Sequence, residues 1–188
     1  NLKNNVFEID YTKKITKINS SGSYSIDEKY DNFDFKVVKN KKNLNFNSKI
    51  SLNSIQILFE DINYTKKKNI FSKVEFHGKL FENKKIIFEE INYSENKNNI
   101  FLSNIHLTNN YKILDLENFK LKYLNDDNRL NELIISKKNK KFKITSKNFD
   151  GKSIIKNLLS GDSKNNFLKR FKNLNTEIIL NFEKFFVH

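Results

Sequence analysis

The stretch LNFNSKISL, residues 44–52, carries the pattern that decides the fold. Leu44, Phe46, Ile50 and Leu52 alternate with polar residues, and Ser48 takes one place in the apolar series. Alternation with a period of two puts one face of a β-strand against apolar material and the other in water. The same alternation recurs at residues 70–80, 119–123 and 141–147. The chain up to about residue 149 is therefore predicted to form strands that each have one apolar face.

Polar segments rich in Asn, Asp and Lys separate these strands, roughly every 10–15 residues, which is the spacing of an antiparallel meander. The sequence has only 4 Gly. Asn also tolerates left-handed backbone conformations, so it can replace Gly in the turns. The predicted fold is mainly β: a long, curled antiparallel meander sheet of repetitive hairpins, shaped like a groove, with one short helix near the C-terminal end.

An internal repeat supports this architecture. The segment FEDINYT, residues 59–65, is nearly restated as FEEINYS at residues 88–94. The separation holds two strands and two turns, so the repeat predicts one hairpin per unit, each packing on its neighbours. The alternative is a chance match within a biased set of residue types.

The pattern changes after residue 149. Ile154, Ile155, Leu158 and Leu159 have helical spacing, Asp150 or Ser153 can cap the helix, and Gly161 can end it. Three regions are therefore expected. Residues 1–149 form the repetitive sheet segment, 150–172 a short helix and polar loop, and 173–188 a strand that opens the next section.

The formal net charge of +13 comes almost entirely from Lys, since Arg129 and Arg170 are the only arginines. A basic chain suggests nucleic acid or an anionic membrane as partner, but nucleic-acid readers usually depend on Arg. AT-rich codon usage, which also fits the abundance of Ile, Phe and Asn, accounts for the Lys residues as solvating groups. We therefore expect no specific nucleic-acid partner. The chain starts at Asn1 and lacks Met, and we expect it to be an internal piece of a longer protein.

Catalytic chemistry finds little support in the residues. Cys is absent, the Gly residues are scattered, and His77, His106 and His188 have no carboxylate at metal-ligand spacing. Adjacent acids such as Glu89 and Glu90 point to opposite faces of a strand. His77 and His106 would form half of a metal site only if they stacked on adjacent hairpins; two exposed strand histidines are the favoured alternative. The chain is therefore expected to be no enzyme and to hold no metal or cofactor.

The apolar side of the predicted sheet needs a cover: a second sheet, a helix layer, closure into a barrel, or a lipid-like ligand. Only one convincing helix is predicted, so an open apolar groove that takes acyl chains is the favoured solution. The lipid-groove candidates are the apolar residues of the clearest strands, Phe46, Ile50, Leu52, Val74, Phe76, Leu80, Phe119, Leu121, Tyr123, Phe142 and Ile144.

The segment SKNFDGKSIIKNLLSG, residues 146–161, lies between a long meander and a further strand. It resembles the AsmA-like family of Gram-negative bacteria, of the YhdP/TamB type, in which a strand runs into an aspartate and a short helix with paired leucines. The resemblance implies a periplasmic protein, anchored in the inner membrane by an N-terminal helix of the parent chain. It also implies a long curled sheet whose apolar groove conducts phospholipids to the outer membrane. It implies no catalytic residues.

Two hypotheses of different classes follow. The leading one is a segment of a bridge-like lipid carrier whose partners are phospholipid acyl chains. The alternative is a structural or adhesive β-repeat scaffold with a filled interior and no ligand. An enzyme or a nucleic-acid binder is the least favoured interpretation.

Overall fold

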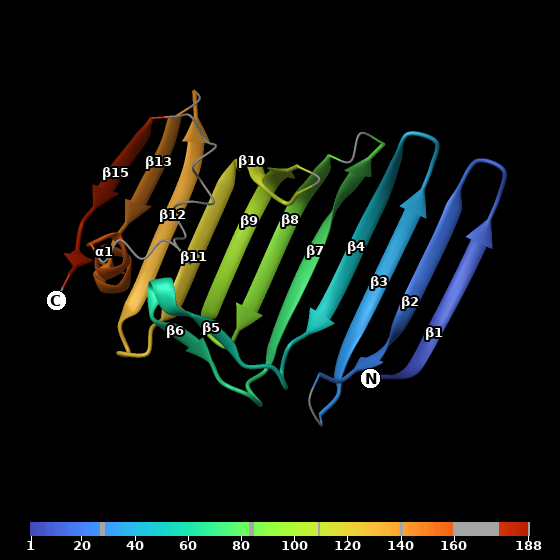
Figure 1. The fold of residues 1–188 in the computed structure, drawn as a ribbon, viewed down its shortest axis with the longest axis horizontal. Coiled ribbons are helices and arrows are strands. Elements are labelled where there is room, and N and C mark those ends of the chain that lie inside the picture. Colours follow the sequence, from blue (N-terminus) through green and yellow to red (C-terminus); the bar gives the residue numbers. More distant parts are fainter. Residues whose placement is uncertain (27–28, 83–84, 109, 140, 160–176, 188) are drawn as a thin grey trace.

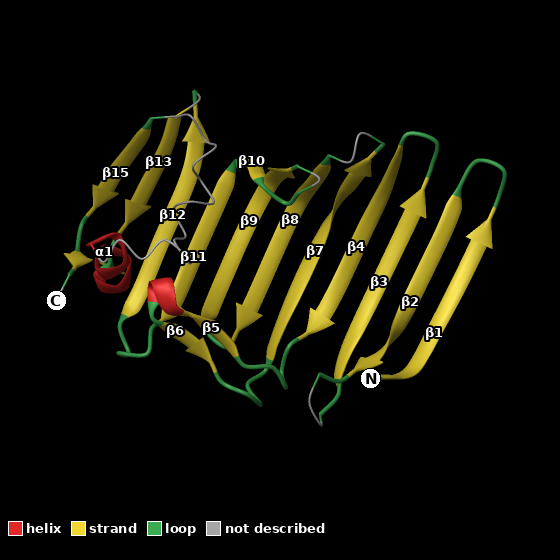
Figure 2. Cartoon of the chain, in the orientation of Figure 1, coloured by secondary structure: helices red, strands yellow, loops and turns green. Residues whose placement is uncertain are grey.

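The computed structural model describes residues 1–26, 29–82, 85–108, 110–139, 141–159 and 177–187. These residues form one large 12-stranded sheet (Figure 1, Figure 2). In spatial order its strands are β1 (Leu2–Tyr11), β2 (Thr16–Tyr24), β3 (Asp31–Lys39), β4 (Asn43–Ser51), β7 (Ser72–Phe81), β8 (Ile86–Glu95), β9 (Asn98–Leu107), β11 (Asn118–Leu124), β12 (Leu130–Lys138), β13 (Lys141–Ser146) and β15 (Ile178–Phe182), with β10 (Ile113–Asp115) paired to β9.

Neighbouring strands from β1 to β13 are antiparallel and follow the chain order, as expected for a meander. β15 is the exception, because it pairs with β13 in parallel. β1 and β15 form the two edges, so the sheet is not closed. The structure confirms the predicted fold class: mainly β, one antiparallel meander sheet, and a short helix near the C-terminal end.

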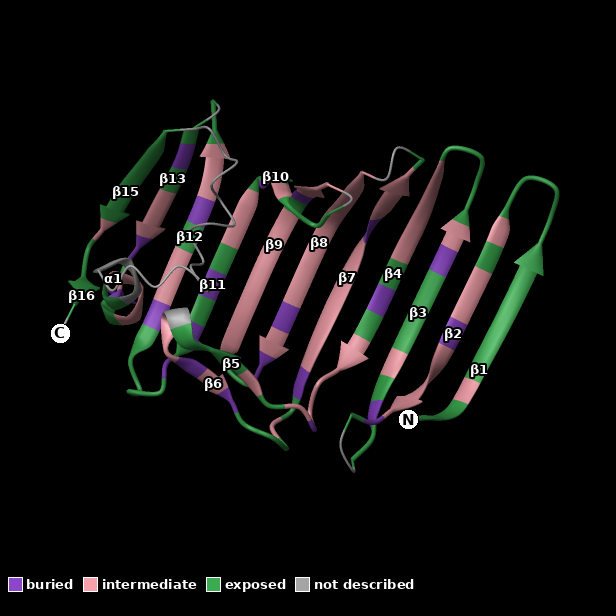
Figure 3. Ribbon diagram, in the orientation of Figure 1, coloured by how far each residue is buried: buried purple, intermediate pink, exposed green. Residues whose placement is uncertain are grey.

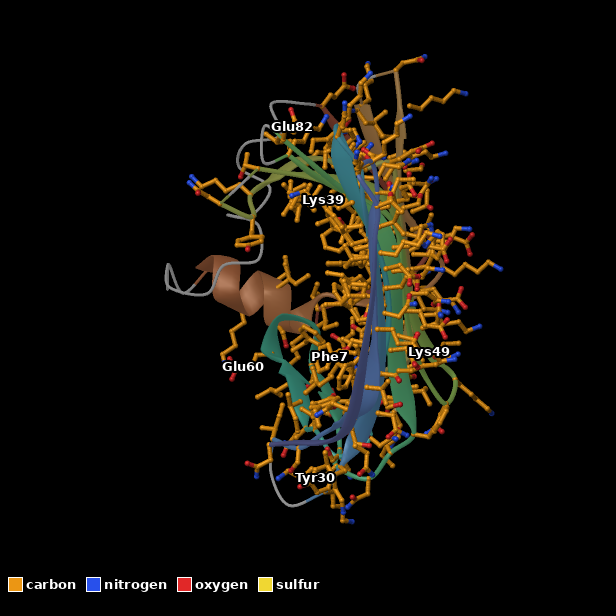
Figure 4. The ribbon with its side chains drawn as sticks, turned by 90° about the vertical axis from the view of Figure 1, so that its right-hand side faces the viewer. Phe7, Tyr30, Lys39, Lys49, Glu60 and Glu82 are labelled. Carbon is orange, nitrogen blue, oxygen red and sulfur yellow. The ribbon has the colours of Figure 1, made fainter. Side chains whose placement is uncertain are left out.

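The remaining elements lie on one side of this sheet. They are the hairpin of β5 (Ile57–Phe59) and β6 (Tyr64–Lys66), the 3-10 turn η1 (Glu60–Ile62) between them, and the helix α1 (Lys152–Leu159). The short strands β14 (Phe149–Asp150) and β16 (Phe185–Phe186) pair in parallel beside α1. Figure 4 shows the helix and the hairpin on the same side, opposite Lys49.

Asn takes over the role of Gly where the backbone turns sharply, as the sequence predicted. Positive φ angles occur at Asn96, Asn128 and Asn139 in turns, and at Asn4 and Asn104 within irregular strands. Asn63 also has a positive φ, of 49°, and ends η1 by donating its backbone N–H to the Glu60 carbonyl. A short polar side chain makes this conformation accessible without Gly.

The apparent repeat does not form repeated structure, which corrects the expectation of one hairpin per unit. Residues 88–94 lie inside β8, whereas residues 59–65 run from β5 through η1 into β6, off the main sheet. The left-handed Asn63 breaks the first copy, but its counterpart Asn92 is paired within the sheet opposite Phe101. Similar local sequence therefore adopts two conformations, because tertiary context decides between them.

The helix α1 forms where its apolar spacing predicted. Asp150 caps it, since its side-chain Oδ1 accepts the backbone N–H of Lys152 at 3.1 Å. The predicted end at Gly161 and the loop to residue 172 lie outside the described residues, as do the side chains of Leu158 and Leu159.

Gly78 offers a test of how closely the sheet is packed. A Cβ at this position would lie 2.1 Å from the Ile87 carbonyl oxygen and 2.8 Å from the Phe46 ring, so backbone would have to move. Gly78→Ala is expected to lower the free energy of unfolding by about 1–3 kcal/mol in urea titrations.

Gly22→Ala is the matched control for this prediction. A Cβ at Gly22 would meet Asn5 first, at 2.0 Å from its side-chain oxygen, on the edge strand β1. The two closest contacts are with this side chain, which can rotate, whereas the Asn5 Cα atom lies 3.0 Å away. This variant is therefore expected to lose clearly less unfolding free energy than Gly78→Ala. Equal destabilisation by the two substitutions would show that β7 and β8 are not packed as described.

Candidate functional site

Apolar side chains occupy one face of the sheet from edge to edge. Directly paired residues of neighbouring strands share a face. The registers therefore place one transverse row on a single face: Phe7, Ser20, Phe35, Ser48, Phe76, Ile91, Leu102, Phe119, Ile135, Ile144 and Leu180. We call this side, which also carries the hairpin and α1, the apolar face.

The opposite side, the polar face, carries ion pairs within and between neighbouring strands. The Glu75 carboxylate lies 3.1 Å from the ammonium groups of both Lys49 and Lys73. Their hydrogen bonds lower the pKa of the Glu75 carboxyl group. Lys122 and Glu132 form a similar pair at 3.2 Å. Half-exposed pairs of this kind contribute little stability each.

His77 and His106 do not combine into a site, and His188 lies outside the described residues. His77 on β7 pairs with Glu90 of β8, and His106 on β9 pairs with Ile87 of β8. The two histidines therefore lie in different transverse rows, on strands that β8 separates. The His77 Nε2 atom is 3.9 Å from Glu89. No group of metal-ligating side chains occurs among the described residues.

One half of the apolar face, over β8 to β13, is covered by the chain itself. Ile105, Leu116, Ile135 and Phe142 form one buried cluster beneath the β10 segment. A second cluster forms where the hairpin meets the sheet, from Tyr64, Leu121 and Tyr123. The candidates Leu121, Tyr123 and Phe142 are thus buried beneath protein in this half, while Phe119 and Ile144 pack beside them.

A buried carboxylate fastens the hairpin to the sheet. Glu95, at the end of β8, accepts hydrogen bonds from the hydroxyl groups of Tyr64 and Tyr93 and from the Asn98 amide. Burial raises the pKa of the Glu95 carboxyl group and raises that of Tyr93 to about 12. The Tyr123 hydroxyl adds a bond of 2.9 Å to the Ile62 carbonyl. The hairpin is therefore a fixed cover, attached through buried polar groups.

The base of the same hairpin is fixed by a buried lysine. The Lys66 ammonium is fully buried and donates to the carbonyl oxygens of Asn53 and Ile55, at 3.1 and 2.6 Å. Burial lowers the pKa of this group. Asp31, at the start of β3, accepts the backbone N–H groups of Asn53 and Ser54. These bonds tie the loop before β5 to the main sheet.

The other half of the apolar face, over β1 to β4, has no cover among the described residues. Phe7 is 64% exposed, Ile9 67% and Phe35 39%, and Figure 3 shows exposure along β1. Phe7 points to the same side as the hairpin in Figure 4. Exposed apolar patches of this extent mark interaction or ligand-binding surfaces. This open half is the candidate functional site.

Five of the candidates are half-buried: Phe46 and Ile50 on β4, within the open half, and Val74, Phe76 and Leu80 on β7, between the open and covered halves. Phe46, Phe76 and Phe88 form an edge-to-face cluster with ring centroids 5.3–6.2 Å apart. Leu52 lies just beyond β4, in the loop that leads to the hairpin.

The sequence-based candidates did not include β1 or β3, the two strands that carry the exposed Phe7, Ile9 and Phe35. Phe33, Phe35 and Val37 alternate with Asp34 and Lys36, the signal that identified the other candidates; of these three, Phe35 is exposed, Phe33 is half-buried and Val37 is buried, at 7% exposure. β1 was harder to place, because the irregularity at residues 4 and 5 shifts its register against β2. The exposure of both strands depends on the position of the cover, which local alternation does not encode.

Comparisons with known proteins assign no family to this chain. No protein-family model matches it, and no similar protein was found among curated sequences or solved structures. The resemblance to the AsmA-like family therefore stays a prediction. Among the described residues, no helix has the length and apolar character needed to cross a membrane.

The Glu95 attachment gives a pH-dependent test. Because burial raises its pKa, the folded state binds this proton more tightly than the unfolded state does. The stabilisation from Glu95 is then complete below its ordinary pKa of about 4.3 and is lost as the pH rises through the raised value. From pH 4 to pH 7, the unfolding free energy of the wild type should therefore fall relative to that of Glu95→Gln. Urea titrations of both proteins at each pH measure this difference.

Glu60→Gln, which removes an exposed carboxylate from η1 on the same hairpin, controls for the loss of one charge. A wild-type advantage over Glu95→Gln that grows with pH would contradict the buried setting of Glu95.

Proposed function

We propose that this chain is a segment of a bridge-like protein that conducts phospholipids between the inner and outer membranes of a Gram-negative bacterium. In this proposal the acyl chains lie on the apolar face while the headgroups stay in water. One observation carries it: the apolar face continues without a cover, among the described residues, across β1 to β4 to an open edge.

The physical basis is the hydrophobic effect. Exposed apolar surface costs roughly 25 cal/mol per Å² in water, so side chains such as Phe7, Ile9 and Phe35 favour an apolar partner. An acyl chain can slide along such a surface, because it forms no directional bonds. Ser20 and Ser48 alternate with phenylalanines in the same row and are themselves buried between the flanking side chains, so the phenylalanines form the exposed surface.

The dimensions place limits on the role. Strands of 9 or 10 residues at about 3.3 Å per residue give a face roughly 30 Å wide. The 11 strands that follow one another across the sheet, about 4.8 Å apart, make it roughly 50 Å long. This length does not join two membranes, so conduction requires a longer sheet that continues past β1 or β15. Periplasmic location and an inner-membrane anchor in the parent chain belong to the same proposal.

The covered half supports a second candidate function, that of a structural scaffold. Over β8 to β13 the interior is filled by the hairpin and the β10 segment, as in a scaffold that needs no ligand. If the open half is covered by protein in the same way, the chain is a structural β-repeat module. Neither function uses catalytic residues, a metal or a cofactor.

Site-specific photocrosslinking separates the two functions. A photoreactive amino acid in place of Phe35 faces the open half, whereas one in place of the next residue, Lys36, faces the polar side. Irradiation in cells, followed by mass spectrometry, should give phospholipid adducts at position 35 in clear excess over position 36. Protein adducts at position 35 would support the scaffold. Lipid adducts at both positions, or at neither, would also contradict the lipid-carrier proposal.

A further inference from the structure

The antiparallel strands place their connecting turns alternately at the two ends of the strands. Each row of strand ends forms one long edge of the sheet, distinct from the edge strands β1 and β15. The turns that follow β1, β3, β7, β9 and β12 lie along one long edge, at the top of Figure 1. The turns that follow β2, β4, β8 and β11 lie along the other. Residues far apart in sequence therefore lie along the same edge. The charge of each edge depends on how many lysines and acids its turns contain.

The top edge collects lysines. Lys13 and Lys14 form the turn after β1, and Lys41 and Lys42 the turn after β3. All these side chains are exposed, and within the described residues none of them forms an ion pair. Lys112 lies exposed further along the same edge, in the turn after β9. We call this the basic edge.

The opposite edge has a different composition. Its exposed turns mix acids with bases, such as Asp126 and Asp127 after β11 with Lys97 after β8 and Lys67 after β6. Codon usage can enrich a chain in lysine everywhere, but it does not sort lysines between edges. One acid, Glu82, lies exposed in the turn after β7, so the difference between the two edges is one of degree: the fold gathers Lys13, Lys14, Lys41 and Lys42 on one edge, and the other edge carries Asp126 and Asp127.

Apolar side chains project together with these lysines. Tyr11 is 77% exposed at the end of β1, Ile15 is 40% exposed in the following turn, and Tyr111 is 75% exposed in the turn before β10. Lysines interspersed with tyrosine and aliphatic side chains suit a membrane surface, where the lysines meet phosphate groups and the tyrosines enter the headgroup layer.

We propose that the basic edge binds the surface of an anionic membrane. Lys13, Lys14, Lys41 and Lys42 would contact lipid phosphates, while Tyr11, Ile15 and Tyr111 enter the interface. Nucleic acid fits this edge less well, because no arginine occurs among its described residues and its lysines lie on hairpin tips along a line instead of lining a groove with stacked aromatics. This inference goes beyond the proposed function and does not depend on it, since surface binding requires no lipid on the apolar face.

Vesicle co-sedimentation provides the first test. The chain should bind vesicles of 70% phosphatidylcholine and 30% phosphatidylglycerol, and not vesicles of phosphatidylcholine alone. Each lysine near an anionic surface contributes about fivefold in affinity, so the double variant Lys13→Ala/Lys41→Ala should bind roughly 25-fold more weakly. Lys67→Ala/Lys97→Ala removes the same charge from two turns of the opposite edge and should bind within about threefold of wild type.

Tryptophan fluorescence provides the second test. The chain contains no Trp, so a single substitution reports without background. The emission of Tyr11→Trp should shift to shorter wavelength on addition of the anionic vesicles, because position 11 enters the interface. Tyr30→Trp, at an exposed position between β2 and β3 on the opposite edge, should show no shift.

Three results would overturn the proposal. The first is equal weakening by the two double variants, which would show that net charge alone drives binding. The second is equal binding to neutral vesicles. The third is tighter binding to a single-stranded oligonucleotide than to anionic vesicles at the same salt concentration. Each of these leaves the crosslinking result at position 35 unaffected, so the two proposals fail independently.

Discussion

A sheet with one apolar face has to shield that face from water. The cover of this sheet and the way the cover is attached both follow from that requirement. The meander pairs nearly all its strands with their sequence neighbours, but backbone pairing leaves the apolar face bare. The chain covers one half itself, with the hairpin of β5 and β6 and the β10 segment. It fixes the hairpin through Glu95 and Lys66, whose burial is acceptable only because each is hydrogen-bonded.

The two halves of the sheet therefore differ in character. The covered half has buried clusters and long-range hydrogen bonds, such as that from Tyr123 to Ile62, and it has the properties of an ordinary core. The open half ends in β1, a long edge strand with exposed apolar side chains. Natural proteins usually protect such edges, because free backbone groups invite another strand. In the proposed lipid carrier, a longer sheet would continue at this edge and an acyl chain would shield the face beside it.

Local sequence patterns were sufficient for the strands and their faces. Alternation placed Phe46, Phe76 and Phe119 on one face, and the registers show that face to be shared. The Asn-rich turns and the helix after Asp150 also followed from local chemistry. The cover could not be predicted, because residues 59–65 resemble residues 88–94 and only tertiary contacts, including the bond between the Tyr64 and Tyr93 hydroxyls, separate their conformations. The boundary between the open and covered halves could not be predicted from the sequence either, because it depends on where the cover lies.

The most direct test of the lipid-carrier account is native mass spectrometry of the chain purified from cells without detergent. The account predicts complexes whose added mass corresponds to phospholipid, and their loss when Phe35 is replaced by Asp, a change at an exposed position that the sheet should tolerate. A folded chain that carries no lipid, or that carries the same lipid after Phe35→Asp, would contradict it.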